Sequence, residues 1–346
     1  MADKPLLSIA IPTYNRARFL KELLDSLLPQ VSSEMPIELI ISDNCSTDET
    51  EATVRALIEK GHPIKYVRNG VNIGPDSNFL QCFEAASGSY AWVLGDDDIL
   101  FEGIISKLLH LLSNNSYSIV YLWPCWFEHD FRMGRRKDPF GRTAEQFTDN
   151  RQFANRVGPS LTFISSVIVN KDQFVQTGLA LDIAGLADTN LAQLGYTFPL
   201  LANGNNFLIV WERFVAGRAN NSGDFGICKI FATNLNRMID RMLAEDPRLT
   251  KTFRNRLIHT WFPYPVLSIR RGDAQMMKDE SLRGMLEPEF RQYWRYWFYL
   301  FPLICLPLRV AELWNNIVLF LDRIRITFMA AERFLLHRNR QRRLGV

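Results

Sequence analysis

The segment Tyr90-Ala-Trp-Val-Leu-Gly-Asp-Asp-Asp98 joins a short apolar run to three consecutive aspartates. This pattern indicates a strand that ends in a carboxylate cluster. Adjacent carboxylates repel one another, and a hard divalent cation such as Mg²⁺ or Mn²⁺ would relieve the repulsion. Because such a cation commonly carries substrate phosphates, the cluster suggests an enzyme that handles a nucleotide diphosphate. The alternative is a solvated acidic turn that opens the next helix.

Strands and helices alternate along the first half of the chain. Apolar runs predict strands at Leu6–Ile11, Ile37–Ile41, Ile64–Val67 and Tyr90–Leu94. Helical spacing predicts helices at Phe19–Leu28, Thr47–Lys60, Ser77–Ala86 and Ile99–Leu112. Ser46 or Thr47 is expected to cap the second of these helices. This order predicts an α/β fold with a mainly parallel central sheet and helices on both faces.

The remainder of the chain changes in character. Residues 117–123 and 163–169 predict later strands, and the polar stretch 128–160 between them is interpreted as a long loop. Past about residue 215, helices are predicted at roughly Phe225–Leu243, Leu249–Leu257 and Glu287–Tyr299. We therefore expect three regions, which are an α/β domain over 1–215, a helical extension over 216–290 and membrane-surface helices over 291–346.

The C-terminal stretch combines aromatic, apolar and basic side chains. Tyr296–Leu308 carries no charge but is shorter than the roughly 18 residues expected of a spanning helix. Apolar residues then keep helical spacing from Val310 to Leu335, and arginines follow Glu332 without a further acid. This pattern favours an interfacial helix that lies on an anionic bilayer. A core or dimer-forming helix hairpin is the alternative.

Composition limits the number of domains, the cellular compartment and the classes of partner. The 346 residues suggest about two domains, and the net charge of +3 says little about partners. The five cysteines form no Cys-x-x-Cys pair, which indicates a reducing compartment, and no signal peptide is expected at the N-terminus. Nucleic-acid binding is disfavoured, because the basic residues concentrate beside an apolar aromatic stretch.

Further polar clusters follow the other predicted strands, and the carboxyl ends of parallel strands are where ligands bind. Pro12-Thr-Tyr-Asn-Arg16 follows the first strand, and Tyr14 there could stack on a base. Asp43 and Asn44 follow the second and favour binding to a base or ribose, whereas Ser46, Thr47 and Asp48 favour helix capping. In the third cluster Gly74 permits close approach, and sugar hydroxyls could be held by Asn72, Asp76 and Asn78. A helix N-cap at Asp76 or Ser77 is the alternative for that cluster.

In this order and spacing, the clusters resemble the inverting family 2 glycosyltransferases with the GT-A fold, over about 1–215. The matching segments are Pro12–Asn15, Asp43–Asp48, Asn72–Asn78 and Gly88–Asp98. Gly95-Asp-Asp-Asp-Ile99 is similar to the segment of bacterial O-antigen transferases of the abequosyltransferase-like group. The resemblance implies a nucleotide-sugar site formed by Pro12, Thr13, Tyr14, Asn15, Arg16, Asp43, Asn44, Asn72, Gly74, Asn78 and Asp96.

The resemblance also implies a metal site at Asp96, Asp97 and Asp98, with Mg²⁺ or Mn²⁺ as the cofactor. Gly95 stands where the family usually has the first Asp of its D-x-D motif, so the ligand is either Asp97 or the pair Asp96 and Asp98. An inverting transferase also needs a general base, which takes the proton of the acceptor hydroxyl during a single displacement.

The family's base is an Asp at the start of a late helix, and here Asp188 is expected in that role. Ala187 replaces the Glu that often precedes it, Asp182 is a rival base, and an N-cap is the alternative role for Asp188.

The expected reaction moves a sugar from a nucleotide-diphosphate donor to a polyprenyl-diphosphate-linked glycan, in bacterial O-antigen or capsule synthesis. The protein would then be peripheral, on the cytoplasmic face of the inner membrane, and its C-terminal helices could pair two copies as a homo-oligomer. One alternative is a sugar-nucleotide nucleotidyltransferase, for which a Gly-rich loop would be expected after the first strand. Another is a catalytically silent membrane scaffold.

Overall fold

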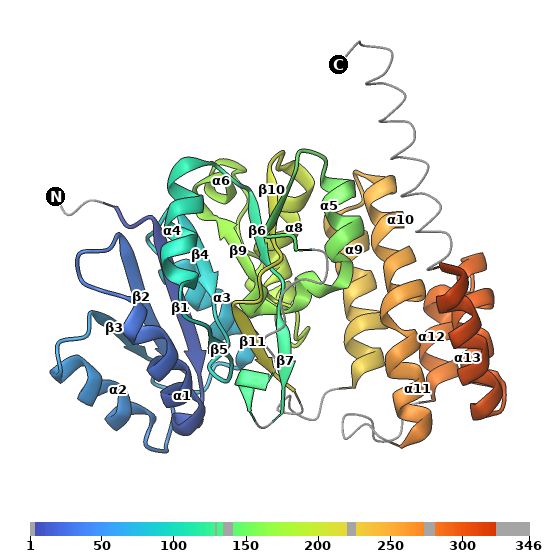
Figure 1. The fold of residues 1–346 in the computed structure, drawn as a ribbon, viewed down its shortest axis with the longest axis horizontal. Coiled ribbons are helices and arrows are strands. Elements are labelled where there is room, and N and C mark those ends of the chain that lie inside the picture. Colours follow the sequence, from blue (N-terminus) through green and yellow to red (C-terminus); the bar gives the residue numbers. More distant parts are fainter. Residues whose placement is uncertain (1–3, 129, 134–140, 220–225, 273–280, 323–346) are drawn as a thin grey trace, which may run out of the picture. The chain divides into compact units, whose positions relative to one another are not determined.

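A computed structural model describes residues 4–128, 130–133, 141–219, 226–272 and 281–322 (Figure 1). The chain forms two compact units. The first comprises Met1–Phe225 and Lys229–Arg254, and the second comprises Gly226–Cys228 and Asn255–Val346. The first helices past residue 215 therefore belong to the α/β unit, whereas the sequence pattern suggested a boundary before them.

The N-terminal half of the first unit has the predicted alternation. Its elements are β1 (Leu7–Thr13), α1 (Ala17–Leu27), β2 (Ile37–Asp43), α2 (Thr50–Glu59), β3 (Ile64–Arg68), α3 (Pro75–Ala85) and β4 (Tyr90–Val93). Every residue of β1 is buried, as its continuous apolar run predicts for a central strand. The α1 helix buries one face through Leu20, Leu23, Leu24 and Leu27.

One predicted helix is wrong at its start. Ile99–Leu100 forms the short strand β5, and α4 begins only at Ile104 and ends at Asn114. Ile99 and Leu100 pair in antiparallel register with β11 (Val215–Arg218), and Gly103 has a left-handed φ of 89° just before α4. Pairing with a strand more than a hundred residues away overrides the local helical spacing.

The main sheet has the order β3-β2-β1-β4-β9-β6-β10-β8. Its later strands are β6 (Ile119–Leu122), β8 (Ala144–Phe147), β9 (Val167–Asn170) and β10 (Phe207–Val210). The β3-β2-β1-β4 half is parallel, β9 runs antiparallel to both β4 and β6, and β8 pairs antiparallel with β10. A second sheet has the order β5-β11-β7, where β7 is Cys125–Phe127.

The stretch 128–160 is not simply a loop. It contains β8 and α5 (Asn150–Val157), whose N-cap Asp149 accepts backbone bonds from Arg151 and Gln152. The polar sequence of β8 suits the edge of a sheet, so it carries no apolar signal. The predicted strand 163–169 starts late, because residues 164–166 form a 3₁₀ turn before β9.

Helices cover the sheet of the first unit. Its later helices are α6 (Lys171–Gln176), α7 (Ile183–Leu186), α8 (Leu194–Asn203) and α9 (Leu235–Met242), and α10 (Pro247–Arg256) spans the boundary between the two units. The α3 helix packs on β1, β2 and β4, and α8 packs on β9 and β6 (Figure 1). The predicted helix Phe225–Leu243 consists instead of a π-helical segment, Lys229–Asn234, followed by α9, and residue 225 lies outside the described ranges.

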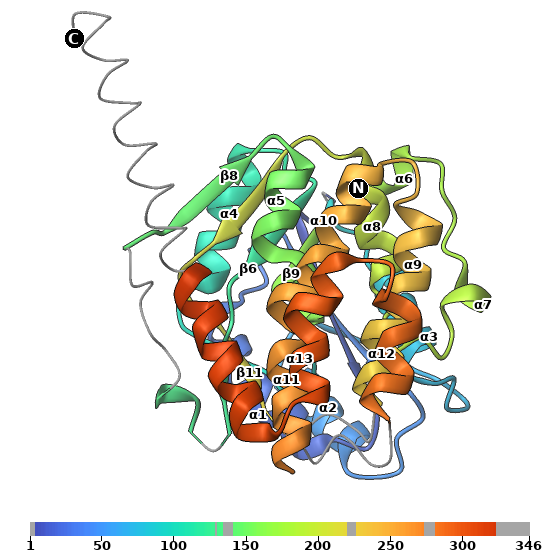
Figure 2. The ribbon, with the colours of Figure 1, turned by 90° about the vertical axis from the view of Figure 1, so that its right-hand side faces the viewer.

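The second unit is helical. Its elements are π-helical Leu257–Trp261, α11 (Pro263–Arg271), α12 (Leu282–Phe290), π-helical Tyr296–Leu300, α13 (Phe301–Cys305) and a helix over 308–322. The predicted helix Glu287–Tyr299 is therefore interrupted after Phe290. The α13 helix packs on both α11 and α12 (Figure 2). Phe262, Phe290 and Leu300 of this unit are buried.

None of the helices in the described ranges has the length and apolar character needed to cross a bilayer. The basic tail, with Arg333, Arg338, Arg340, Arg342 and Arg343, lies outside the described residues.

Candidate active site

The loops after β1 and β2 are bonded to each other. Asn15, in a left-handed conformation with φ 52°, donates its backbone N–H to Ser46 Oγ over 2.9 Å. Its Oδ1 accepts the backbone N–H of Thr47 over 2.7 Å. The adjacent Tyr14 is 41% exposed, and stacking of its ring on a base stays a prediction. Asp48 accepts the N–H of Ala17 in α1 and of Thr50 in α2. Because α2 begins only at Thr50, after Glu49, and has no side-chain N-cap, the predicted cap at Ser46 or Thr47 is wrong.

The end of β1 also reaches the aspartate cluster. Thr13 Oγ1 donates to Asp96 Oδ2 over 2.7 Å. Arg16 forms ion pairs with Asp96 over 3.0 Å and with Asp97 over 3.2 Å. Burial raises the pKa of Asp96 to about 7, although the Arg16 charge opposes that shift. The structure thus brings together Thr13, Arg16 and two of the predicted carboxylates.

Asp98 points into a different environment. Its Oδ1 accepts the backbone N–H of Arg218 in β11 over 3.1 Å. Burial, and secondly the Asp97 charge, raise the pKa of Asp98 to about 8, while a hydrogen bond from Ser165 opposes the shift. The Arg218 side chain donates to the backbone carbonyl of Asp97 over 3.1 Å. Arg218 and Ser165 belong to late elements, and the sequence alone did not indicate either residue.

The carboxylates therefore differ in their access to solvent. Asp96 and Asp98 are 3% and 4% exposed, whereas the Asp97 side chain is 19% exposed. A Cβ at Gly95 would lie 3.1 Å from Ser165 Oγ and 3.2 Å from Asp98 Oδ2, which explains physically why glycine suits this position. Of the alternatives left open by the sequence, Asp97 is the carboxylate best placed to reach a bound ligand.

The described residues contain no group of three or more His, Cys, Asp or Glu side chains that could hold a metal ion. A metal caged by protein ligands is therefore not supported in this part of the chain. The site does fit a Mg²⁺ or Mn²⁺ ion that takes one or two carboxylates and completes its shell with phosphate oxygens and water. The partly exposed Asp97, with Asp96 beside it, would hold such an ion.

Asp43 and Asn44, at the end of β2, are buried. Asp43 accepts the N–H of Ser46 over 2.8 Å and the hydroxyl of Tyr66 over 2.5 Å. Asn44 donates to Asn72 Oδ1 over 2.8 Å and accepts the N–H of Ile73 over 2.9 Å. Both side chains shape the loops around the site, and direct contact of either with a nucleoside stays a prediction.

The third cluster is built in a similar way. Gly74, with φ 83°, directly precedes α3, and its carbonyl accepts a bond from Asn44 over 3.2 Å. Asn72 Oδ1 accepts the N–H of Gly74, and Asn78 exchanges hydrogen bonds with Ser42. These amides hold the start of α3 against the end of β2. Their predicted contact with sugar hydroxyls remains untested.

Asp76, at the start of α3, connects this region to the candidate base. It is 3% exposed and accepts the backbone N–H groups of Asn190 over 2.9 Å and Ala192 over 3.3 Å. Burial raises the pKa of Asp76, although these bonds oppose the shift. The segment that it holds contains Asp188 and Asn190, both left-handed, with φ 58° and 55°.

Asp188 does not begin a helix, contrary to the prediction. It lies between α7 and α8, and α8 starts only at Leu194. Left-handed backbone at Asp188 and Asn190 cannot continue a helix, and the N-cap alternative fails for the same reason. The Asp188 side chain is exposed, as a base that meets an acceptor must be.

Asp182, the rival base, has a structural role. It caps α7 through the N–H of Gly185 over 3.0 Å and forms an ion pair with Arg241. The hydrogen bond from Arg241 holds the pKa of Asp182 below its usual range. Because Asp182 is engaged in a helix cap and an ion pair, whereas the Asp188 side chain is exposed, the geometry favours Asp188 over Asp182.

Residues 8–168 match the family Glycosyl transferase family 2. The chain is 34% identical over 181 residues to abequosyltransferase RfbV of Salmonella typhimurium, which covers 49% of the chain and 54% of that protein. It is also 34% identical over 118 residues to a Campylobacter jejuni GalNAc(5)-diNAcBac-PP-undecaprenol beta-1,3-glucosyltransferase, covering 34% of the chain and 37% of the relative. The matched region thus spans about half or less of these relatives.

Solved structures show the same fold. TarS of S. aureus, residues 1–349, in complex with UDP, has a TM-score of 0.61 at 17% identity, covering 90% of this chain and 88% of TarS. The mannosyltransferase PcManGT of Pyrobaculum calidifontis, in complex with GDP-Man and Mn²⁺, has a TM-score of 0.52 at 15% identity, covering 91% and 88%. Residues 8–168 of the chain belong to glycosyl transferase family 2, within an α/β fold of the GT-A kind.

Proposed function

We propose that this family 2 domain is an inverting glycosyltransferase that takes a sugar from a nucleotide-diphosphate donor. The main observation behind the proposal is that residues at the end of β1 contact the aspartate cluster that follows β4. Thr13 and Arg16 contact Asp96, and Tyr14 is exposed one residue after Thr13. A base, a diphosphate and a cation could therefore be held at one edge of the parallel sheet, where ligands of such sheets bind.

The donor would lie with its base near Tyr14 and its diphosphate near Asp97 and Arg16. A bound Mg²⁺ or Mn²⁺ would neutralise negative charge on the diphosphate. Arg16 would supply a second positive charge beside the same phosphates, because its guanidinium already reaches both Asp96 and Asp97. The UDP bound by TarS and the GDP-Man and Mn²⁺ bound by PcManGT support this class of donor and cofactor.

Asp188 would act as the general base. Its carboxylate would take the proton from the acceptor hydroxyl while the hydroxyl oxygen attacks the anomeric carbon. The bond from that carbon to the nucleoside diphosphate breaks in the same displacement, so the configuration inverts. Asp76 would hold the segment around Asp188 in place through the backbone of Asn190 and Ala192.

We propose a polyprenyl-diphosphate-linked glycan as the acceptor, in the synthesis of a bacterial surface polysaccharide such as O-antigen or capsule. The Campylobacter relative, which is named for a PP-undecaprenol glycan, supports a lipid-linked acceptor. The Salmonella relative, an abequosyltransferase, supports the sugar-transfer class.

We propose a peripheral location on the cytoplasmic face of the inner membrane, and the surface of the second unit supports contact with a membrane. In the helix over 308–322, Val310, Leu313, Ile317 and Phe320 recur every three or four residues and are 45–62% exposed. Ala311 and Val318, on its other face, are buried. An exposed apolar stripe with Arg309 beside it, and with Arg323 and Arg325 following in the sequence, fits an anionic bilayer surface.

Charge substitution in the stripe tests membrane attachment. The double variant L313E/F320E should lose sedimentation with anionic phospholipid vesicles, whereas Asn316→Glu, an exposed position beside the stripe, should keep it. Equal vesicle binding by both variants would contradict the location. A change from dimer to monomer in L313E/F320E, with no wild-type vesicle binding, would show that the stripe pairs two copies instead.

A thermal-shift panel of nucleoside diphosphates, with and without Mn²⁺ or Mg²⁺, tests the donor site. One nucleotide should raise the Tm in a metal-dependent manner, because a ligand at 100 times its Kd stabilises by about 2.7 kcal/mol. Turnover of the matching nucleotide sugar should then release a nucleoside diphosphate. Release of pyrophosphate would identify a nucleotidyltransferase, and the absence of any nucleotide binding would favour a silent scaffold.

A further inference from the structure

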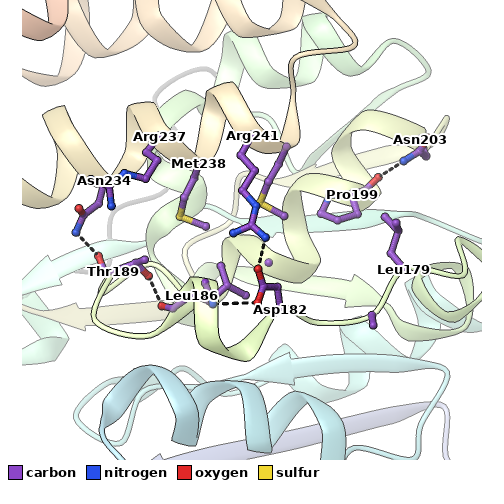
Figure 3. Close-up of a pocket in the computed structure, with 14 residues that line it drawn as sticks. Leu179, Asp182, Leu186, Thr189, Pro199, Asn203, Asn234, Arg237, Met238 and Arg241 are labelled. Carbon is purple, nitrogen blue, oxygen red and sulfur yellow. Dashed lines mark hydrogen bonds and ion pairs between the residues drawn. The ribbon is translucent and has the colours of Figure 1, made fainter.

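A cavity of about 270 Å³ lies in the first unit beside the segment that carries Asp188 (Figure 3). Leu186 and Thr189 line it on one side, and side chains of α9 line it opposite. Asn234 Nδ2 donates to the carbonyl of Thr189 over 3.1 Å, which ties the α9 side to this segment. The cavity and the candidate base therefore share a stretch of backbone, yet the mechanism proposed above does not use the cavity.

Much of the lining is aliphatic. It includes Leu179, Leu186, Pro199, Met238 and Met242, and no described residue of the lining is aromatic. Methionine side chains adapt to flexible apolar groups. Leu179 lines the cavity and is 51% exposed, so part of the apolar lining reaches solvent. This lining suits a hydrocarbon chain that enters from solvent.

Two arginines add positive charge to the same lining. Arg237 and Arg241 are four residues apart on α9 and so lie on one face of the helix. Arg241 is paired with Asp182, whereas Arg237 is exposed and forms no ion pair with a described residue. With two guanidinium groups and one carboxylate, the lining is net positive. Guanidinium groups suit phosphate oxygens because they offer paired donors.

We propose that this cavity binds the diphosphate and the first isoprenoid units of the lipid-linked acceptor. Arg237, together with Arg241, would contact the diphosphate, and the aliphatic lining would contact the isoprenoid. Because the cavity adjoins the Asp188 segment, the saccharide between the diphosphate and the reacting hydroxyl would be short. This inference rests on the proposed glycosyltransferase function, and it adds where the lipid end of the acceptor binds.

Calorimetry with farnesyl diphosphate tests the inference. The titration uses the full chain in the presence of EDTA, so that a metal at the aspartate cluster cannot bind the diphosphate. Parallel titrations with inorganic pyrophosphate and with farnesol separate the two parts of the ligand. Farnesyl diphosphate should bind more tightly than either part. In a second titration, with Mn²⁺ in place of EDTA so that the donor site can be filled, a saturating concentration of the donor's nucleoside diphosphate should not displace it.

Two variants locate the binding site. Arg237→Met should weaken farnesyl diphosphate about tenfold or more, as expected for the loss of a charge-assisted hydrogen bond. Ala180→Trp should also weaken it, because Ala180 is an exposed residue of the cavity lining that a large ring would block. Arg248→Met, an exposed arginine of α10 outside the lining, is the matched control and should bind like the wild type.

Several results would overturn the inference. Pyrophosphate that binds as tightly as farnesyl diphosphate would remove the role of the apolar lining. Displacement by the nucleoside diphosphate would place the ligand in the donor site, and equal affinities for the Arg237→Met and Arg248→Met variants would exclude the cavity. Metal-dependent nucleotide binding and donor turnover are measured separately, so failure at the cavity is distinguishable from failure of the proposed function.

Discussion

The proposed site has a donor half, the aspartate cluster, and a base half, the Asp188 segment, and the two are built differently. Asp96 and Asp98 are almost completely buried and held by several side-chain and backbone partners. Asp188 is exposed, and the backbone around it is held by Asp76 through Asn190 and Ala192. The difference indicates a preformed donor half and a base half that depends on few contacts, so substitutions should separate binding from turnover.

Asp188→Asn should have the largest effect. Loss of a general base typically costs about 10² to 10⁴ in rate, and the amide cannot take the acceptor proton. Binding of the nucleoside diphosphate, measured by calorimetry with Mn²⁺, should stay unchanged because Asp188 lies outside the donor half. Near-normal turnover would reject Asp188 as the base, and Asp182→Asn is the comparison that would then identify the rival.

Asp97→Ala should break the donor half instead. Metal-dependent nucleotide affinity is expected to fall roughly tenfold to a hundredfold, the range seen when groups that support a bound metal are removed. Asp25→Ala, which removes an exposed carboxylate of α1, should leave the affinity as it is. Unchanged calorimetric affinity of Asp97→Ala with Mn²⁺ would contradict the assignment of Asp97 as a ligand.

Asp76→Asn should have an intermediate effect, on turnover alone. The amide retains one acceptor oxygen, so one of the two charge-assisted bonds to Asn190 and Ala192 is lost, each worth about 1.5–3 kcal/mol. The kcat should fall about tenfold while the donor KM stays constant. A parallel loss of nucleotide affinity would show that Asp76 supports the whole fold rather than the base segment.

The smallest expected effect is the pH dependence of stability at Asp76. Burial raises the pKa of this carboxyl above its unfolded value of about 3.9, so the folded chain binds the proton more tightly. The resulting contribution is fully present below pH ~4 and is lost as the pH rises through the folded pKa. In urea unfolding, the stability of the wild type relative to Asp76→Asn should therefore decrease from pH ~4 upward. A flat difference would contradict the shift.

Comparison of individual elements shows which parts of the fold the local sequence pattern predicted and which it missed. The apolar runs and helical spacings located β1 to β4 and α1 to α3, and the polar clusters at the strand ends do meet. The β5 strand, the edge strand β8 and the break before α8 were missed. Each of these features depends on a contact with residues distant in the chain. The amino-acid pattern of a short segment does not reveal such a contact.

The sequence by itself determined the alternating fold, the aspartate cluster and the family. Buried strands and the loops that follow them can be identified from short runs of apolar residues and the polar residues next to them. Only the tertiary structure decided which carboxylate remains accessible. Arg218 and Ser165 come from late elements to hold Asp98, and Ser165 also crowds Gly95, so Asp97 is the most exposed carboxylate of the three. The tertiary structure also decided the position of Asp188. The buried carboxylate of Asp76, 114 residues before Asn190, accepts the Asn190 N–H and so holds the left-handed backbone of this segment, which no helical pattern predicts.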